Sequence, residues 1–147
     1  MWRAVSVNND ANTTKLVTQW NISEITYSNG SIAFDSSYMQ EWLNDTSVDG
    51  FLGNLRESEN FIVMEAKWDA TEDSRVLGSI TRPNGTTIAT DAVGLLNIYE
   101  YQSSYHGTTY DSGYLNNGLY WWNLTPTNDT FIRLIYSDGT ANGTTPW

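Results

Sequence analysis

The sequence contains no cysteine, and this absence excludes several kinds of chemistry. Without thiols the chain forms no disulfide, offers no cysteine ligand to zinc and has no thiol nucleophile, and its redox compartment is left undetermined. A single histidine, His106, excludes a metal site built from several histidines. We therefore expect neither a metal site nor a cofactor.

Basic residues and long apolar runs are also scarce. The chain carries 7 basic and 17 acidic residues, a formal charge of −10, and Arg133 is the only basic residue after Arg82. Nucleic-acid binding needs clustered positive charge against the phosphates, so we exclude it. A bilayer span needs about 20 predominantly apolar residues in a row, and the apolar runs here are much shorter. We expect no membrane-spanning segment and no signal peptide within these residues.

Small polar residues and short β-prone runs make up most of what is present. The 147 residues are enough for one domain with one core, and they include 15 Asn, 14 Ser and 18 Thr. Short runs rich in Val, Ile, Thr, Tyr and Trp are separated by Gly, Asn and Asp, with no repeat and no sustained helical period. This pattern predicts a strand-dominated domain with long loops.

Local patterns predict particular elements. Residues 2–7 and 15–20 alternate around Asn8-Asn9-Asp10 and predict an opening hairpin. Ser37 and Gln40 have the spacing of a capping box, which predicts a short helix that ends near Asn44. Asn97 and Glu100 repeat that spacing and predict one or two helical turns within residues 97–104.

Further runs predict strands and turns. Residues 61–64 and 66–68 predict strand, and residues 82–85 read Arg-Pro-Asn-Gly, a turn signal. Residues 119–124 and 131–136 predict a hairpin, with Pro126 ending the first strand and residues 137–139 ending the second.

No catalytic constellation stands out. His106 is the only histidine that could serve a hydrolytic triad, it lies in a loop-like run, and no Gly-x-Ser-x-Gly motif is present. The spacing of the 17 acidic residues singles out no carboxylate pair for glycoside hydrolysis. No Gly-rich phosphate loop occurs. We therefore expect a protein that is not an enzyme.

The acidic, Asn-rich loops raise the possibility of a calcium-binding site. Asn128-Asp129 and Ser137-Asp138-Gly139 carry the oxygen ligands that this ion prefers. Neither has the alternating acidic positions of a calcium loop, and ordinary turn chemistry explains both. We expect no metal at either place.

The sequence contains eight Asn-x-Ser/Thr sequons where about three are expected by chance. N-glycosylation would favour an extracellular or cell-surface location. The alternative is that Asn-Gly-Ser/Thr forms good turns, as at three of these sites. The eight sequons begin at Asn12, Asn21, Asn29, Asn44, Asn84, Asn123, Asn128 and Asn142.

Aromatic residues gather toward the C-terminal end. Seven of the nine tyrosines lie between Tyr99 and Tyr136, interleaved with Ser, Thr, Asn, Asp and Gly, and Trp121-Trp122 lie in the same segment. Tyr and Trp supply rigid contact area while Ser, Asn and Gly supply adaptable hydrogen bonds, a combination typical of antigen-binding surfaces. The segment therefore predicts a binding face.

Not every aromatic residue in this segment belongs to that face. Trp121 and Leu134 have the phase of core positions in strands, whereas Tyr105, Tyr110 and Tyr114 follow no strand period and are expected to be exposed. The candidate ligand contacts are Tyr105, His106, Tyr110, Asp111, Tyr114, Asn116, Asn117, Tyr120, Trp122, Asn123, Asn128, Asp129 and Tyr136.

Five short motifs suggest a family. They are Trp2-Arg3-Ala4-Val5, Trp42-Leu43-Asn44, Val93-Gly94-Leu95-Leu96 with Glu100-Tyr101, Tyr120-Trp121-Trp122-Asn123-Leu124-Thr125-Pro126, and Ser137-Asp138-Gly139. In this order, over nearly the whole chain, they resemble bacterial and archaeal surface modules of the C-type-lectin-like fold. That superfamily also contains the formylglycine-generating enzyme.

The resemblance implies an α+β domain with short helices packed on small antiparallel sheets, long loops and a ligand-presenting C-terminal half. In one branch, the variable proteins of diversity-generating retroelements, a C-terminal segment is rewritten at adenine-containing codons, which readily yields Asn, Tyr, Asp, Ser, Thr and His. Residues 99–142 are dense in these types. The enzyme branch depends on cysteines that this chain lacks, and the calcium-dependent sugar motif of animal lectins is absent as a unit.

We therefore predict a single domain over residues 1–147 that binds a protein or glycan ligand through residues 99–142, outside the cell or at its surface. We expect that it is not an enzyme, that it binds neither nucleic acid nor a cofactor, and that it does not insert directly into a membrane. Two alternatives stay open. One is an adhesive or structural module of a pilus or surface layer, and the other is a glycoside-active enzyme that uses an acid pair.

Overall fold

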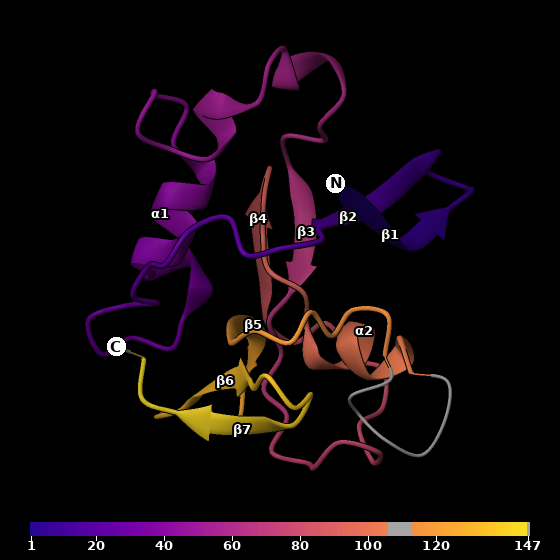
Figure 1. Cartoon of the computed structure of the whole chain (residues 1–147), viewed down its shortest axis with the longest axis vertical. Coiled ribbons are helices and arrows are strands. Elements are labelled where there is room, and N and C mark those ends of the chain that lie inside the picture. Colours follow the sequence, from indigo (N-terminus) through magenta and orange to yellow (C-terminus); the bar gives the residue numbers. More distant parts are fainter. Residues whose placement is uncertain (106–112, 147) are drawn as a thin grey trace.

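The computed structural model describes residues 1–105 and 113–146 and shows a mixed α and β architecture with small antiparallel sheets and few helices (Figure 1). This agrees with the expected α+β class. Its elements in chain order are β1 (Trp2–Asn8), β2 (Thr13–Thr18), η1 (Phe34–Ser36), α1 (Tyr38–Asn44), η2 (Leu52–Asn54), η3 (Ser58–Asn60), β3 (Ala66–Asp69), β4 (Ile88–Asp91), α2 (Ile98–Ser103), β5 (Trp121–Pro126), β6 (Ile132–Ile135) and β7 (Ala141–Thr144).

The described strands form three separate antiparallel sheets. β1 pairs with β2, β3 pairs with β4, and β6 lies between β5 and β7. In Figure 1 the β1–β2 hairpin projects to one side, and the chain that follows β2 crosses in front of the β3–β4 pair toward α1. Strands distant in sequence are therefore held together by side-chain packing and loop contacts rather than by one continuous ladder.

The opening hairpin forms where the alternation predicts it. Asn8 shapes its turn, because the Asn8 side-chain oxygen accepts hydrogen bonds from the N–H groups of Asp10 and Ala11. An isolated two-stranded hairpin is marginally stable in water, so its inner face must pack on the body. Val5 and Val17 supply this packing, and the Lys15 ammonium group lies 2.5 Å from the Glu100 carboxylate of α2.

Both predicted helices are confirmed, together with their caps. The Ser37 hydroxyl accepts a hydrogen bond from the Gln40 N–H at 3.0 Å, and α1 ends at Asn44 as expected. At α2, Asn97 and Glu100 form a complete capping box in which each side chain accepts the backbone N–H of the other. Such caps satisfy backbone donors that a short helix otherwise leaves unpaired.

The predicted strand over residues 61–64 is wrong. There the chain leaves a 3₁₀ turn, and the N–H groups of Phe61 and Ile62 both donate to the Ser58 carbonyl. This local bonding takes up the N–H groups that a sheet would need, and only β3 is strand. Two further strands, β4 and β7, were not expected from the sequence, because each has only four residues and neither has a run of large apolar side chains.

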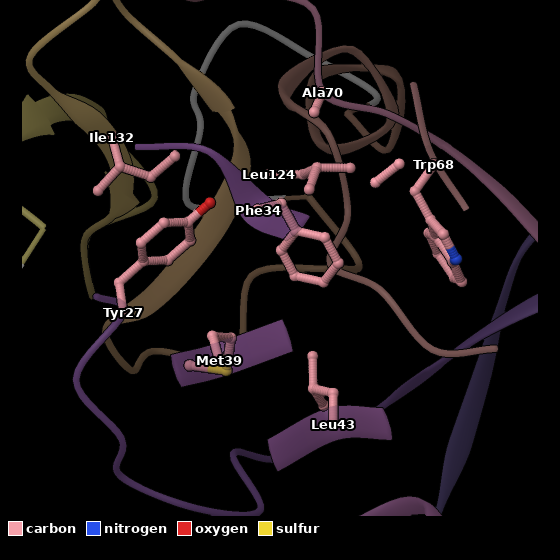
Figure 2. Close-up of a cluster of buried hydrophobic side chains, with 9 residues drawn as sticks. Tyr27, Phe34, Met39, Leu43, Trp68, Ala70, Leu124 and Ile132 are labelled. Carbon is pink, nitrogen blue, oxygen red and sulfur yellow. The ribbon is translucent and has the colours of Figure 1, made fainter. Parts of the chain in front are cut away.

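Two buried clusters form the core. The first joins side chains from the η1–α1 region to β3, β4, β5 and β6, and its arrangement is seen in Figure 2. The second lies around α2. The first cluster comprises Tyr27, Phe34, Met39, Leu43, Trp68, Ala70, Ala89, Leu124 and Ile132, and the second comprises Ile80, Leu96, Ile98, Tyr101, Leu115 and Ile135.

Tyrosine ionisation predicts that the fold weakens at alkaline pH. Burial raises the pKa of both Tyr27 and Tyr101, and nearby Asp35 and Asp138 add to the respective shifts. The native state thus keeps these protons after the unfolded chain loses them, so stability is complete below about pH 10 and falls above it, by up to about 1.4 kcal/mol per pH unit for each residue. We expect the part of the tyrosinate absorbance at 295 nm that belongs to Tyr27 and Tyr101 to rise only as circular dichroism reports unfolding; completion of the rise before unfolding would contradict this.

Within residues 1–105 and 113–146, no helix combines the length and the apolar character that crossing a bilayer requires. The two α-helices have seven and six residues, and a helical span takes about 20.

Candidate functional site

The sequence-predicted contact residues do not all reach one surface. Tyr105 is half-buried rather than exposed, because its ring meets Tyr101 edge-on at 5.2 Å and its hydroxyl donates to the Gly139 carbonyl at 3.1 Å. The close approach of Gly113 to this ring leaves no room for a side chain there. Tyr105 thus completes the second core cluster. His106, Tyr110 and Asp111 lie outside the described residues.

Trp122 and Asn123 also belong to the interior. The Trp122 indole N–H donates to the Ile25 carbonyl at 3.0 Å, and its ring packs against Tyr27 with centroids 5.6 Å apart. Asn123 is fully buried, and its side-chain oxygen accepts the Thr125 N–H at 3.0 Å. Asn123, which the sequence suggests as a ligand contact, therefore has no exposed surface in this fold.

Asn128 and Asp129 form the turn between β5 and β6. The Asn128 side-chain oxygen accepts the N–H groups of Thr130 and Phe131, each at 2.9 Å. The Asp138 carboxylate serves the next turn in the same way, and its hydrogen bonds from Thr140 hold its pKa below the ordinary value. Turn chemistry accounts for both fragments. Among the described residues no group of three or more His, Cys, Asp or Glu side chains could hold a metal ion.

The remaining predicted residues are exposed or half-buried, and Tyr120 and Tyr136 contact each other. Tyr120 is 56% exposed and its ring meets Tyr136 edge-on at 5.4 Å. Tyr114 is exposed, and its hydroxyl donates to the Ala4 carbonyl of β1 at 3.3 Å. Asn117 is half-buried and shapes the connecting loop, since its side-chain oxygen accepts the Leu119 N–H at 3.0 Å.

A segment from the other end of the chain is hydrogen-bonded to two of these residues. The Asn21 side-chain amide donates to the Tyr120 carbonyl at 2.6 Å, and Asn117 in turn donates to the Asn21 side-chain oxygen at 3.1 Å. These bonds bring the segment that carries Trp20 and Ile22, each about half exposed, to the backbone of Tyr120 and to Asn117. We call the set the aromatic–amide surface. Its members are Trp20, Asn21, Ile22, Tyr114, Asn116, Asn117, Leu119, Tyr120 and Tyr136.

Sequence reasoning missed residues 20–22 because they are 99 positions away from Tyr120 in the chain. The alternation that predicts the opening hairpin does place Trp20 at its end, but it gives no partner for the side chain. Only the hydrogen bonds between Asn21, Asn117 and Tyr120 reveal that the two segments share a surface.

The sequons are unequal in accessibility. Five of the eight asparagines are exposed, whereas Asn123 is buried and Asn44 is held by hydrogen bonds from its amide to the carbonyls of Gln40 and Val93. A glycan on Asn123 is incompatible with this fold, because the attached sugar would need the space that the core fills. The exposed sequon asparagines are Asn12, Asn21, Asn29, Asn84 and Asn142.

Comparison with known proteins finds no relative of this chain. No model of a known protein family, no curated protein and no solved structure matches this chain. Its function must therefore be inferred from the chain's own residues and their geometry.

Proposed function

We propose that this protein is a non-enzymatic recognition module of the C-type-lectin-like fold that binds a protein or glycan ligand through the aromatic–amide surface. The observation that carries the proposal is the pair of hydrogen bonds that Asn21 makes with Tyr120 and Asn117. They join two segments distant in sequence into one surface. The proposal places this surface outside the cell or on it.

The physical character of the surface supports binding. Single exposed hydrophobic residues are normal on monomeric proteins, whereas grouped ones mark interaction sites. Here Trp20, Ile22, Leu119 and Tyr120 are each 42–56% exposed around amide side chains. Large aromatic side chains dominate binding energies, and the neighbouring amides give hydrogen-bonding specificity.

The recognition test uses two variants of the surface and one matched control. Tyr120→Ala and Trp20→Ala each remove an exposed ring, and the first keeps the Tyr120 carbonyl that accepts from Asn21. Phe61→Ala removes an equally exposed ring outside the surface. Each protein is applied to a glycan microarray and to a panel of purified surface proteins, and the hits are titrated by biolayer interferometry.

We expect each surface variant to weaken binding at least tenfold, because a central aromatic contact is worth about 2 kcal/mol or more. Phe61→Ala should bind as the unmodified protein does. Equal binding by all three variants, or no hit on either panel, would reject the proposal. Light scattering on the same samples tests the assembly alternative, which requires concentration-dependent filaments.

We further propose that the exposed part of residues 99–142 is diversified by a retroelement. Its density of Tyr, Asn, Ser and Thr supports this. The burial of Asn123 and Leu124 limits which positions can vary, because most core substitutions destabilise the fold. We expect the encoding genome to hold a second copy of this segment beside a reverse transcriptase gene, with adenine differences at codons 114, 117 and 120 and none at 123 or 124. A genome without such a copy would contradict diversification.

A further inference from the structure

A polar pocket lies away from the aromatic–amide surface and shares no residue with it. Its volume is about 190 Å³, and it is lined by the loop after β3, the loop before β4, the start of α2 and Thr125 of β5. At about 30 Å³ of liquid volume per water molecule, this is the space of roughly six waters. The pocket therefore has room for one small molecule.

Three of the chain's seven basic residues gather at this pocket. Arg75 and Arg82 line it. Arg133 lies behind the lining loop, is 2% exposed, and donates from its guanidinium to the carbonyls of Asp73 and Arg75. The lining holds two basic side chains, Arg75 and Arg82, and two acidic ones, Glu72 and Asp73, so the charge of Arg133 behind it brings the local sum to +1 in a chain of charge −10.

The acidic groups at the pocket do not cancel this balance. Asp73 is already paired, because both of its carboxylate oxygens accept from Arg75, at 2.9 and 2.6 Å. Burial raises the pKa of Asp73, but the hydrogen bonds from Arg75 and the charges of Arg75 and Arg133 outweigh it and hold that pKa below the ordinary value. Glu72 is exposed at the rim.

Two donor groups at the pocket lack a partner. Asn97 is 6% exposed and lines the pocket; its oxygen accepts the Glu100 N–H, while its amide N–H groups make no hydrogen bond within residues 1–105 and 113–146. Arg82 likewise has neither hydrogen bond nor ion pair in this part of the chain. The Asn97 amide nitrogen is not one of the fully buried unpaired atoms of the described residues, and Arg82 is exposed, so both donors reach the water in the pocket, where a ligand oxygen can replace that water.

We propose that this pocket binds a small hydroxylated carboxylate of the uronic-acid class. Its carboxylate accepts hydrogen bonds from the Arg82 guanidinium and the Asn97 amide, the type of charge-assisted contact that is strongest in proteins. The ligand hydroxyls face the Thr71 and Thr81 side chains and the Glu72 carboxylate, all at the pocket lining. The same group can come from a free sugar acid or from the acidic end of a glycan.

The test titrates D-glucuronate into the isotopically labelled protein and follows backbone amides by NMR. Arg82→Gln removes an unpaired charge. Asn97→Asp removes the free donor and keeps the helix cap, because Asp caps as well as Asn. Arg56→Gln is the control with the same charge change. The Arg56 side chain is 92% exposed and does not line the pocket.

We expect saturable shifts at residues 82, 97, 99 and 125, at least tenfold weaker binding in Arg82→Gln and Asn97→Asp, and unchanged binding in Arg56→Gln. D-glucose and acetate should each bind at least tenfold more weakly than glucuronate. Methyl β-D-glucuronide distinguishes the two sources: binding as tight as the free acid assigns a glycan end, and loss of binding assigns a free acid.

Several outcomes would overturn the proposal. They are no saturable shifts with glucuronate at 50 mM, equal affinity for D-glucose or for acetate, and equal weakening by Arg56→Gln. Because the pocket shares no residue with the aromatic–amide surface, the Tyr120→Ala protein should still bind glucuronate, and this separates a failure here from a failure of the proposed function.

Discussion

Replacement of Tyr101 by alanine is expected to lower the free energy of unfolding by about 3–5 kcal/mol, the range for deleting a large buried aromatic side chain. Tyr101 is fully buried in the second core cluster. Its ring meets Tyr105 and Trp121 edge-on, each with centroids 5.2 Å apart, and its hydroxyl donates to the Gly139 carbonyl at 2.8 Å. The substitution therefore removes contacts that join α2 to β5 and to the turn after β6.

The conservative control is Tyr101→Phe, which keeps the ring and deletes the hydroxyl. It should cost only about 1 kcal/mol, because the Gly139 carbonyl retains its hydrogen bond from Tyr105. Urea unfolding followed by tryptophan fluorescence measures both variants. A loss below about 1.5 kcal/mol for the alanine variant would show that this cluster does not hold the fold together.

Replacement of Arg133 by methionine is expected to lower the free energy of unfolding by about 2–3 kcal/mol, although Arg133 lies in a strand where a hydrophobic residue would be expected. Arg133 is 2% exposed, and burial lowers the pKa of its guanidinium while the Asp73 carboxylate opposes that shift. Its guanidinium donates to the carbonyls of Asp73 and Arg75, which lose these donors in the variant. The loop that lines the polar pocket should loosen as a result.

Arg75→Met is the matched control for this substitution. Arg75 carries the same side chain at a position that is 45% exposed, so water competes for its charge in the ion pair with Asp73, whose side chain is 10% exposed. We expect a much smaller loss of stability, measured in the same urea titrations. Equal losses for the two variants would show that the contribution of Arg133 to the free energy of unfolding does not come from its burial. Hydrogen exchange at residues 73–75 should rise in Arg133→Met.

The local elements were predictable where a short pattern decides the conformation. The caps at Ser37 and Asn97 and the alternation of the opening hairpin depend on neighbours within a few residues, and the structure has all three. The run at residues 61–64 shows the limit of this reasoning. It has the composition of a strand, yet it finds no partner strand, and the preceding 3₁₀ turn takes up its first N–H groups.

The candidate site was predictable only in part. The aromatic and amide composition drew attention to Tyr114 and Tyr120, which are exposed, and equally to Asn123, which is fully buried. Residue type does not distinguish a side chain that binds a ligand from one that is hydrogen-bonded within the core. The difference is burial, and burial depends on contacts made across the whole chain.

By itself the sequence determined an acidic, cysteine-free chain of short strands and helices, with aromatic and amide residues concentrated toward its C-terminal end. These properties follow from composition and from neighbours along the chain. Only the tertiary structure decided that Asn21 bonds to Tyr120, that Asn123 is enclosed, and that Arg133 supports the loop that lines a pocket. Each of these depends on contacts across tens of residues, and no local pattern encodes which distant segments will meet.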